Sequence, residues 1–135
     1  GYTVNTAARF EGANKQYGSN IMIGQFTYEA SKHAIEAREL DLINVVGKKE
    51  PVPIYELLAK KGELTPGKMK ALEFYHQGLL VHRERRFDEA MGMFAQGLAL
   101  DKTDGPCKAL VKRCEEYIID PPPKNWNGAF VMTSK

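Results

Sequence analysis

The sequence has few cysteines, no long apolar run and no strong excess of charge of either sign. Cys107 and Cys114 are its two cysteines, too few for the disulfide framework of a small secreted domain. The longest uncharged run, residues 16–28, contains polar residues and is shorter than the roughly 18 apolar residues of a membrane span. A formal net charge of +2 gives no reason to expect nucleic acid as a partner. These absences favour a cytoplasmic protein.

We expect no secretory signal peptide in this segment, because no basic segment followed by an apolar one opens the printed sequence. The chain begins Gly1-Tyr2-Thr3-Val4, and a helical pattern starts almost at once. We therefore expect a piece of a longer parent protein, with no membrane contact through this segment and with the parent's own membrane attachment left open. The 135 residues are 43% apolar and 27% charged, which is typical of a folded globular protein.

The first 58 residues predict a mixed α+β segment. Good helix formers run from residue 4 to residue 17, and Gly18 is a typical helix stop. An apolar run at residues 21–23 predicts a buried strand, and Thr27 predicts the cap of a short helix that ends near residue 34.

A hairpin is predicted next, at residues 40–58. Residues 40–46 are partly apolar on both alternating faces, which is typical of a strand covered on each side. Residues 47–50 predict a turn, and residues 51–58 predict the second strand. Pro51 and Pro53 favour a sheet edge or an irregular start for that strand, because proline cannot donate to a ladder.

From residue 59 the sequence turns polar and then helical. Residues 59–66 predict a linker ending in Thr65 as a helix N-cap and Pro66 in the first turn. Apolar stripes then predict three helices over residues 67–119, with Asp88 as the cap of the second. The stripes are Met69, Leu72, Tyr75, Leu79 and Leu80, then Met91, Phe94, Ala95 and Leu98, then Cys107, Leu110, Val111, Cys114, Tyr117 and Ile118.

A proline-rich tail over residues 120–135 ends the third helix at the run 121–123. The tail carries Trp126, the single tryptophan of the chain, and further apolar residues at 129–132. Because so many apolar groups are rarely left in water, we expect the tail to pack against the rest of the molecule.

One motif stands at the start of the chain, where residues 1–12 read GYTVNTAARFEG. Asn5 and Arg9 in it are spaced i, i+4, so they share one face of the predicted helix. The motif resembles the C-terminal part of the class III nucleotidyl cyclase catalytic domain, whose pattern is roughly G-x-x-V-N-x-A-x-R-x-E. The resemblance continues through residues 14–18, 21–23, 38–41 and 47–57, and so covers residues 1–58, under half of the chain.

The resemblance implies a partial ferredoxin-like fold and two catalytic roles. Cyclisation of a nucleoside triphosphate spreads negative charge over the transferring phosphoryl group, and a guanidinium fork suits phosphate oxygens. By resemblance, Asn5 orients the ribose and Arg9 stabilises the transition state. On the residues alone, a solvated helix face remains the alternative for this pair.

The resemblance also implies what this chain lacks. In the family, two aspartates bind two Mg²⁺ or Mn²⁺ ions, and these residues and those that select the base precede the matched segment. Family active sites form between two catalytic domains. We therefore expect a homodimeric parent that acts on ATP or GTP in intracellular signalling, with adenine favoured, and an inactive isolated chain.

Lys48 is a further candidate, for the substrate phosphates. Many members of the family carry a basic residue just before the turn glycine, where this chain has Val46. Lys48 and Lys49 follow that glycine and could take over the role of the missing basic residue. Two turn lysines that are simply exposed to solvent are an equally good interpretation.

The helical half weakly resembles a single tetratricopeptide-type unit, with Gly78, Ala90, Phe94 and Gly97 at the small and aromatic positions. It also resembles the C-terminal extension of bacterial cyclases. The alternative to a structural cap is a helical module that binds a protein partner and exposes an apolar groove between its first two helices.

Histidine and cysteine give no metal motif. His76 and His82 are six residues apart, not at the i, i+4 spacing of a helical metal pair. We interpret the charged run 82–86 as cations favoured at a helix C-terminus, and Cys107 and Cys114 as part of a core stripe.

Overall fold

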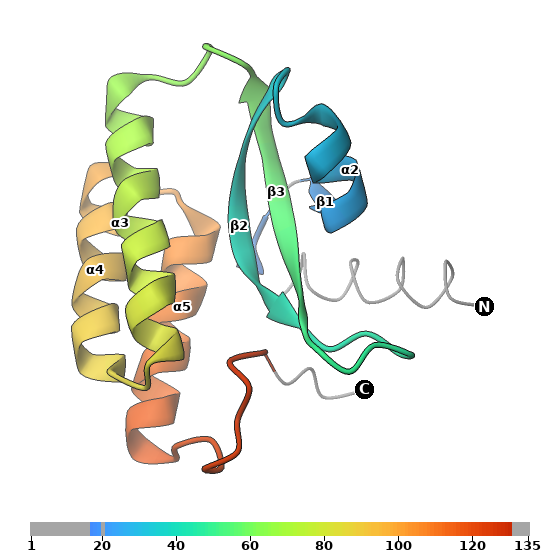
Figure 1. The fold of residues 1–135 in the computed structure, drawn as a ribbon. Coiled ribbons are helices and arrows are strands. Elements are labelled where there is room, and N and C mark those ends of the chain that lie inside the picture. The colour runs from blue at the N-terminus through green and yellow to red at the C-terminus, as the bar shows by residue number, and fades with distance from the viewer. Residues whose placement is uncertain (1–16, 20, 131–135) are drawn as a thin grey trace.

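The computed structural model of the chain describes residues 17–19 and 21–130. In this part the architecture is α+β, with an antiparallel sheet beside a layer of three helices (Figure 1). None of the described helices is both long enough and apolar enough to cross a membrane. The elements in chain order are β1 (Met22–Gly24), α2 (Gln25–Ser31), β2 (Ile35–Ile43), β3 (Val52–Lys60), α3 (Pro66–Arg83), α4 (Phe87–Leu100) and α5 (Gly105–Ile119).

The sheet has the strand order β1-β3-β2, so β3 is its central strand. The prediction of an edge position for the proline-bearing strand is therefore wrong, and the irregular start is what remains. Pro53 pairs with Leu42 of β2, while β1 pairs only with residues 54–56 of β3. At Pro53, β3 is therefore paired with β2 alone. Because β1 does not reach this residue, the missing N–H of Pro53 breaks no hydrogen bond between β3 and β1.

Two other predicted boundaries differ from the structure. Strand β2 begins at Ile35, five residues before the predicted start, and includes charged side chains that find partners on other elements. Helix α2 begins at Gln25 with Gly24 as its N-cap, so Thr27 lies inside the helix and is not the cap. The extended backbone of Gly24 leads directly from β1 into the helix, which needs no side-chain cap.

The helix starts show which capping signals hold. Thr65 caps α3, and its Oγ1 accepts a hydrogen bond from the Lys68 amide at 3.1 Å, as predicted. Asp104 caps α5 in the same way through the Cys107 amide at 3.1 Å. Asp88 is not the cap of α4, because the helix already begins at Phe87 after a left-handed turn at Arg85, where φ is 68°.

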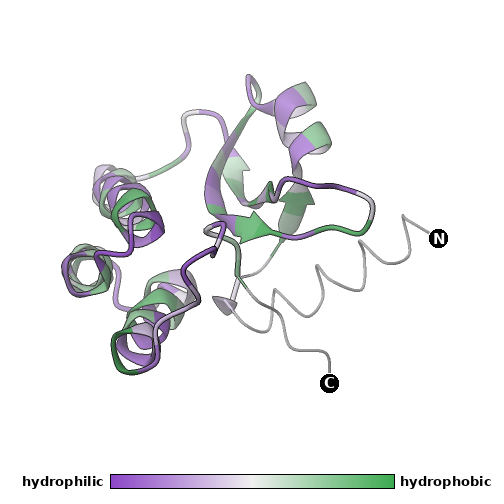
Figure 2. Ribbon diagram, turned by 60° about the horizontal axis from the view of Figure 1, so that its bottom comes forward, coloured by the Kyte–Doolittle hydropathy of each residue, from purple (hydrophilic) through white to green (hydrophobic). Residues whose placement is uncertain are grey.

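The apolar stripes identify the helices but only part of their buried faces. On α3, Met69 and Leu80 are 53% and 48% exposed, whereas Gly78 and His82 are buried. Gly78 is buried because the Phe94 ring occupies the place of its missing side chain. Ala95 and Ile118 are likewise exposed. Figure 2 shows the three helices nearly end-on, as one layer beside the sheet.

Sheet, helices and tail share one core. Leu40 and Ile54 of the sheet pack in the same cluster as Leu79 of α3, Phe94 of α4 and Leu110 of α5. The tail packs as expected, since Trp126 lies against this cluster and the Phe130 amide donates to the Leu42 carbonyl at 2.9 Å. The predicted division of the chain at residues 59–66 stays a prediction.

Candidate functional site

The residues predicted to act in catalysis fall in two places. Asn5 and Arg9 lie outside the described residues, so their placement stays a prediction. Lys48 is exposed in the turn after β2, and its amide donates to the Val45 carbonyl at 3.1 Å. Gly47 precedes it with φ 86°, a conformation that favours glycine. This exposed position is compatible with both interpretations of Lys48.

Tyr17 marks the end of the predicted N-terminal helix. Its backbone is helical, and Gly18 follows with φ 62°, so the predicted stop at Gly18 is confirmed. The Tyr17 side chain is fully buried, and its hydroxyl donates to Asp41 Oδ2 of β2 at 2.6 Å. The end of this helix is therefore held inside the molecule.

Arg113 of α5 binds the same carboxylate oxygen of Asp41 through Nη1. Its guanidinium carbon lies 5.0 Å from the centre of the Tyr17 ring and 4.0 Å from that of Phe130. Both contacts have cation–π geometry. We call Tyr17, Asp41 and Arg113 the Asp41 clamp, because one buried carboxylate joins three elements.

Burial and neighbouring charge fix the proton positions in the clamp. Burial, reinforced by Asp41, raises the pKa of Tyr17, so the phenol keeps the proton that it donates. Burial acts to lower the pKa of Arg113, but Tyr17 and Asp41 outweigh it and leave this pKa raised. The clamp therefore holds a cation against a carboxylate and a neutral phenol.

A second group of charges, the Arg38 network, comprises Arg38, Glu56 and Asp104, which are buried, and Lys68 and Asp101, which are half-buried. Arg38 of β2 donates to Glu56 of β3 at 2.8 Å and to both carboxylate oxygens of Asp104 at the start of α5. Lys68 of α3 donates to Asp101 at 2.8 Å and to Asp104 at 3.1 Å. These side chains line a cavity of about 240 Å³ together with Gly18 and Gly105.

Asp104 is the centre of this network. Burial alone would raise the pKa of its carboxyl, but the hydrogen bonds and charge of Arg38 hold that pKa well below its usual range. The carboxylate also accepts from the Cys107 amide at the N-terminus of α5, where negative charge is favoured. Asp104 therefore holds the start of α5 to Arg38 of β2, which in turn binds Glu56 of β3.

Gly18, the residue after Tyr17, makes a further contact with Gly105 at the start of α5. A Cβ atom on Gly105 would lie 2.9 Å from the Tyr17 carbonyl oxygen, too close for any side chain. The end of the N-terminal helix and the start of α5 thus meet backbone to backbone.

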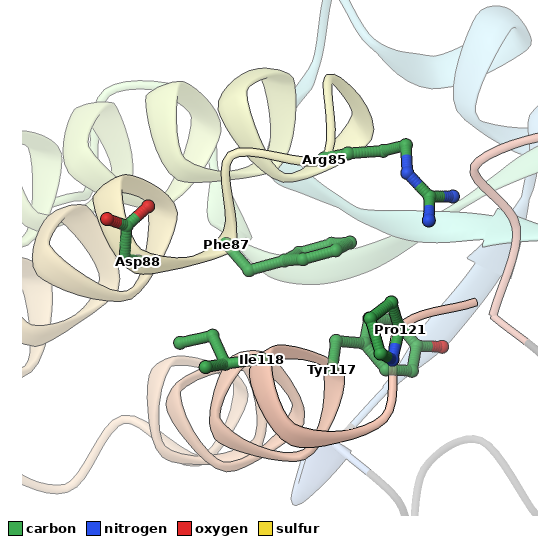
Figure 3. Close-up of a pocket in the computed structure, with 6 residues that line it drawn as sticks. All are labelled: Arg85, Phe87, Asp88, Tyr117, Ile118 and Pro121. Atoms are coloured by element: carbon green, nitrogen blue, oxygen red, sulfur yellow. The ribbon is translucent and has the colours of Figure 1, made fainter. Parts of the chain in front are cut away.

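A surface pocket of about 390 Å³ lies between the first turn of α4 and the last turn of α5 (Figure 3). Phe87 and Tyr117 form its apolar walls, and Arg85 lies at its edge. Arg85 donates to the carbonyls of Pro122 and Pro123 at 2.6 and 3.0 Å, which ties the tail to this end of the helices.

His82 lies beneath this pocket in an aromatic cluster. Its ring centre is 5.2 Å from Phe87, 5.7 Å from Tyr117 and 5.5 Å from Trp126. Burial lowers the pKa of His82 to about 4, so the ring is neutral at pH 7. The interpretation of His82 as one of the cations favoured at this helix C-terminus is therefore wrong.

The cysteines are buried as the core stripe predicted, and Cys114 Sγ lies 3.7 Å from Nδ1 of His82. Burial raises the pKa of Cys114 to about 12, which leaves an unreactive thiol. Within residues 17–19 and 21–130, no group of three or more His, Cys, Asp or Glu side chains could hold a metal ion.

The chain is related in sequence to an adenylate cyclase. The relative is the "Adenylate cyclase, terminal-differentiation specific" of Dictyostelium discoideum, which is 34% identical over 122 residues, or 87% of this chain. The chain spans about 6% of the length of that relative. No family model and no solved structure matches the chain. The tetratricopeptide and bacterial assignments find no support in this relative.

The extent of the match is informative in itself. Residues 1–58 are less than half of the chain, so a match over 87% of it must include much of the helical part. The sequence similarity to the cyclase relative therefore extends into the residues of α3–α5.

Proposed function

We propose that this chain is the C-terminal part of a class III nucleotidyl cyclase catalytic domain, joined to a helical extension that caps its sheet. The protein that contains it forms a cyclic nucleotide and pyrophosphate, with ATP favoured over GTP. The 34% identity to an adenylate cyclase over 87% of the chain is the observation that carries this proposal.

In this reaction the ribose 3′ oxygen attacks the α-phosphorus, and the bond from that phosphorus to the leaving pyrophosphate breaks. Asn5 orients the ribose through its uncharged amide. Arg9 binds phosphoryl oxygens as negative charge spreads over them, which lowers the barrier through a preformed cation. Lys48 contributes a mobile positive charge for the terminal phosphates.

The two divalent ions of the family fit no part of the described structure. Residues 17–19 and 21–130 contain no group of carboxylates and imidazoles suited to a metal ion. We therefore assign no step of the reaction in this chain to a metal, and we expect the isolated chain to be inactive.

A cyclase assay tests the proposal. The protein in which this chain follows the rest of a catalytic domain is assayed with ATP and with GTP, each with Mg²⁺ and with Mn²⁺. Arg9→Ala should lower product formation by ~10²–10³, the usual effect of removing one transition-state donor. Arg86→Ala, at an arginine whose side chain is 52% exposed, is the matched control and should leave the rate unchanged.

The alternative function is a helical module that binds a protein partner. It predicts an apolar groove between α3 and α4, but Phe94 packs against Gly78 at that place. One observation favours it, namely that Ile118, which lines the pocket of Figure 3, is 47% exposed. The next residue of the chain, Ile119, is 85% exposed. A folded, dimeric parent that makes no cyclic nucleotide would make this module the leading function.

A further inference from the structure

We propose that the open edge of β2 and the facing side of α3 bind an extended peptide segment of a partner protein. The segment adds to the sheet as a further strand and inserts an apolar, preferably aromatic, side chain beside β2. In this mode of recognition, main-chain hydrogen bonds supply affinity and the adjoining pocket supplies specificity. The inference goes beyond the proposed function and does not depend on it, because it rests on backbone groups of β2 and side chains next to them.

Strand β2 has one side without a neighbouring strand, because the order of the described sheet is β1-β3-β2. The Leu57 amide of β3 donates to the carbonyl of Ile21, the residue before β1, at 2.9 Å, so Leu57 directs its backbone groups away from β2. Opposite residues of an antiparallel pair either bond to each other or both point away. Ala37, the partner of Leu57, therefore directs its N–H and C=O outwards, and the regular register gives Glu39 the same direction.

Farther along, other parts of the chain cover this edge. The Leu40 carbonyl accepts the Tyr75 hydroxyl at 2.8 Å, and the Leu42 carbonyl accepts the Phe130 amide at 2.9 Å. Phe130 also forms a parallel bridge with Ile43. This edge of β2 therefore already pairs with one extended segment, which is the tail of the chain itself.

The part of the edge at Ala37 and Glu39 is left open. Among residues 17–19 and 21–130, no group outside the sheet makes a hydrogen bond to the backbone of either residue. Unpaired N–H and C=O groups at a sheet edge are a template for a further strand. Two outward-facing residues offer up to four main-chain hydrogen bonds to an added segment, in line with the edge that the tail already uses.

A cavity of about 280 Å³ adjoins this open part of the edge. Residues 37–39 of β2 line it on one side, and Leu72, Tyr75 and His76 of α3 line it on another. The three α3 residues are spaced i, i+3, i+4 and so share one helix face. Figure 1 shows β2 as the strand of the sheet nearest to α3. Because a helix stands beside the edge, the space fits a single extended chain better than the edge of a second folded sheet.

Aromatic rings provide most of the apolar lining. Tyr28 of α2 stacks on Tyr55 of β3, with ring centres 3.9 Å apart and ring planes at 8°. Tyr75 and His76 add two rings from α3, and Leu72 adds an aliphatic surface. An inserted aromatic side chain would find partners here on several sides, and aromatic pairs gain more than the buried area alone provides.

The charged side chains of the lining are already paired. Arg38 donates to Glu56 at 2.8 Å, and Glu39 accepts from Arg83 at 2.6 Å. A charged side chain of the peptide would have to compete with these pairs, whereas an apolar side chain leaves them intact. The lining therefore favours an apolar side chain at the inserted position.

A peptide selection tests the inference. A phage-displayed library of random linear nonapeptides is selected on the full 135-residue chain. Enriched peptides should carry an aromatic residue flanked by strand-forming residues. In NMR titration, a synthetic copy of the best peptide should shift the amide signals of residues 36–40 and 72–76. A selection that enriches no such peptide would overturn the inference, and so would shifts confined to other residues, such as those of the pocket of Figure 3.

A matched pair of peptides separates strand addition from side-chain contact. N-methylation of the two amides that face β2 keeps every side chain but removes two main-chain hydrogen bonds, so Kd should rise by about tenfold or more. N-methylation of the two intervening amides, which face away from the sheet, should change Kd by less than about twofold. An equal rise in Kd for both peptides would show that binding is not strand addition.

Two variants of the chain test the two walls of the site. Ala37→Pro removes the outward N–H, and the pairing with Leu57 contains no hydrogen bond that it could break. Leu72→Glu places a charge on the apolar wall of α3 and remains informative if Ala37→Pro does not fold. Each should raise the Kd of the selected peptide by about tenfold. Glu73→Gln, at a side chain of α3 that is 61% exposed, is the matched control and should bind as the original chain does.

The remaining outcomes are equally decisive. Unchanged binding in a folded Leu72→Glu chain would refute the site, as would a loss in Glu73→Gln equal to that in Leu72→Glu. Sedimentation of the chain alone tests for a second copy as the occupant. A dimer that Ala37→Pro converts to a monomer would replace the peptide by another copy of β2. All of these measurements are made without nucleotide, so failure of the cyclase proposal and failure of the peptide site are seen separately.

Discussion

The sheet–helix interface and the helix–helix interface of this protein are built from different chemistry. Between sheet and helices, Arg38, Asp41 and Arg113 are all at least 93% buried and are paired with opposite charges from distant elements. Among the helices, Phe94 packs on Gly78, and His82 stacks at 17° to Tyr117 in an aromatic cluster.

The difference separates two requirements of the fold. Apolar contacts tolerate small shifts, and they supply most of the free energy of burial. Buried ion pairs add little net stability, but they allow few relative placements of their partners. The helices are therefore held together by packing, whereas their register on the sheet depends on specific charges.

The largest expected effect comes from removing a buried ion pair at the sheet–helix interface. Asp104→Ala leaves Arg38 and Lys68 without their shared carboxylate and removes the cap of α5. We expect a loss of ~3–5 kcal/mol in the free energy of unfolding, measured by urea denaturation. Asp88→Ala, at an exposed acid of the first turn of α4, should change stability by less than about 0.5 kcal/mol. Similar small losses for both variants would show that the network does not hold the interface.

The aromatic cluster around His82 should make the stability of the protein depend on pH. The folded pKa of His82 is about 4, below the unfolded value of 6.5, so the unfolded chain binds the proton first. Stability should therefore fall as the pH drops from about 6.5 to about 4, by about 3 kcal/mol in all. His82→Phe should remove this slope in unfolding measured across that range. His76→Gln, at an exposed position of α3, should retain it.

The carboxylate of Asp104 titrates in a separate window. Its folded pKa is depressed, so its contribution is present above the unfolded pKa and is lost as the pH falls below about 3.8 towards the folded value. Loss of stability confined to this acid range, with none near pH 5, would contradict the burial of a neutral His82.

Tight packing between α3 and α4 predicts opposite effects for two glycines. A Cβ on Gly78 would lie 2.7 Å from the Phe94 ring, so Gly78→Ala should destabilise by ~1–3 kcal/mol in thermal unfolding. At Gly92 of α4, no atom of the described residues lies within 4 Å of such a Cβ, and Gly92→Ala should stabilise by about 0.5–1 kcal/mol through helix propensity. Phe94→Leu should relieve part of the destabilisation caused by Gly78→Ala. If the effects of the two substitutions on stability simply add, the contact between Gly78 and Phe94 is not the cause.

The smallest effect is expected for the Arg83–Glu39 ion pair between α3 and β2, which is only partly buried. The Arg83 and Glu39 side chains are 20% and 22% exposed, so water screens their pair. Arg83→Gln should cost no more than about 1 kcal/mol, and less at high salt. A cost near that of Asp104→Ala in the same urea titration would mean that burial does not distinguish the two pairs.

Local signals in the sequence predict the order of elements well. The Thr65-Pro66 start of α3, the Gly18 stop and the prolines after α5 act within a few residues, and the structure confirms each. The start of β2 could not be predicted, because charged residues such as Arg38 hide the strand. Their partners lie 18 and 66 residues away, which no local pattern reveals.

The candidate site was predicted only in part. The motif of residues 1–12 gives Asn5 and Arg9, which the described residues do not include, and the resemblance at the hairpin turn gives Lys48, which is exposed. Arg113 and Asp104 were missed because the sequence shows each as an ordinary charged residue. The one available signal was the position of Arg113 between Leu110 and Cys114, inside a stripe that is otherwise apolar.

The backbone contact of Gly18 with Gly105 has a consequence for recombining such proteins. A chimaera that joins residues 1–60 of this chain to the helical part of a relative must supply glycine, or an equally close approach, at position 105. It must also supply a cation to meet Asp41 and an anion to meet Arg38. Crossovers that bring these three residues along with the helices should give folded hybrids, whereas crossovers chosen by helix hydrophobicity alone should not.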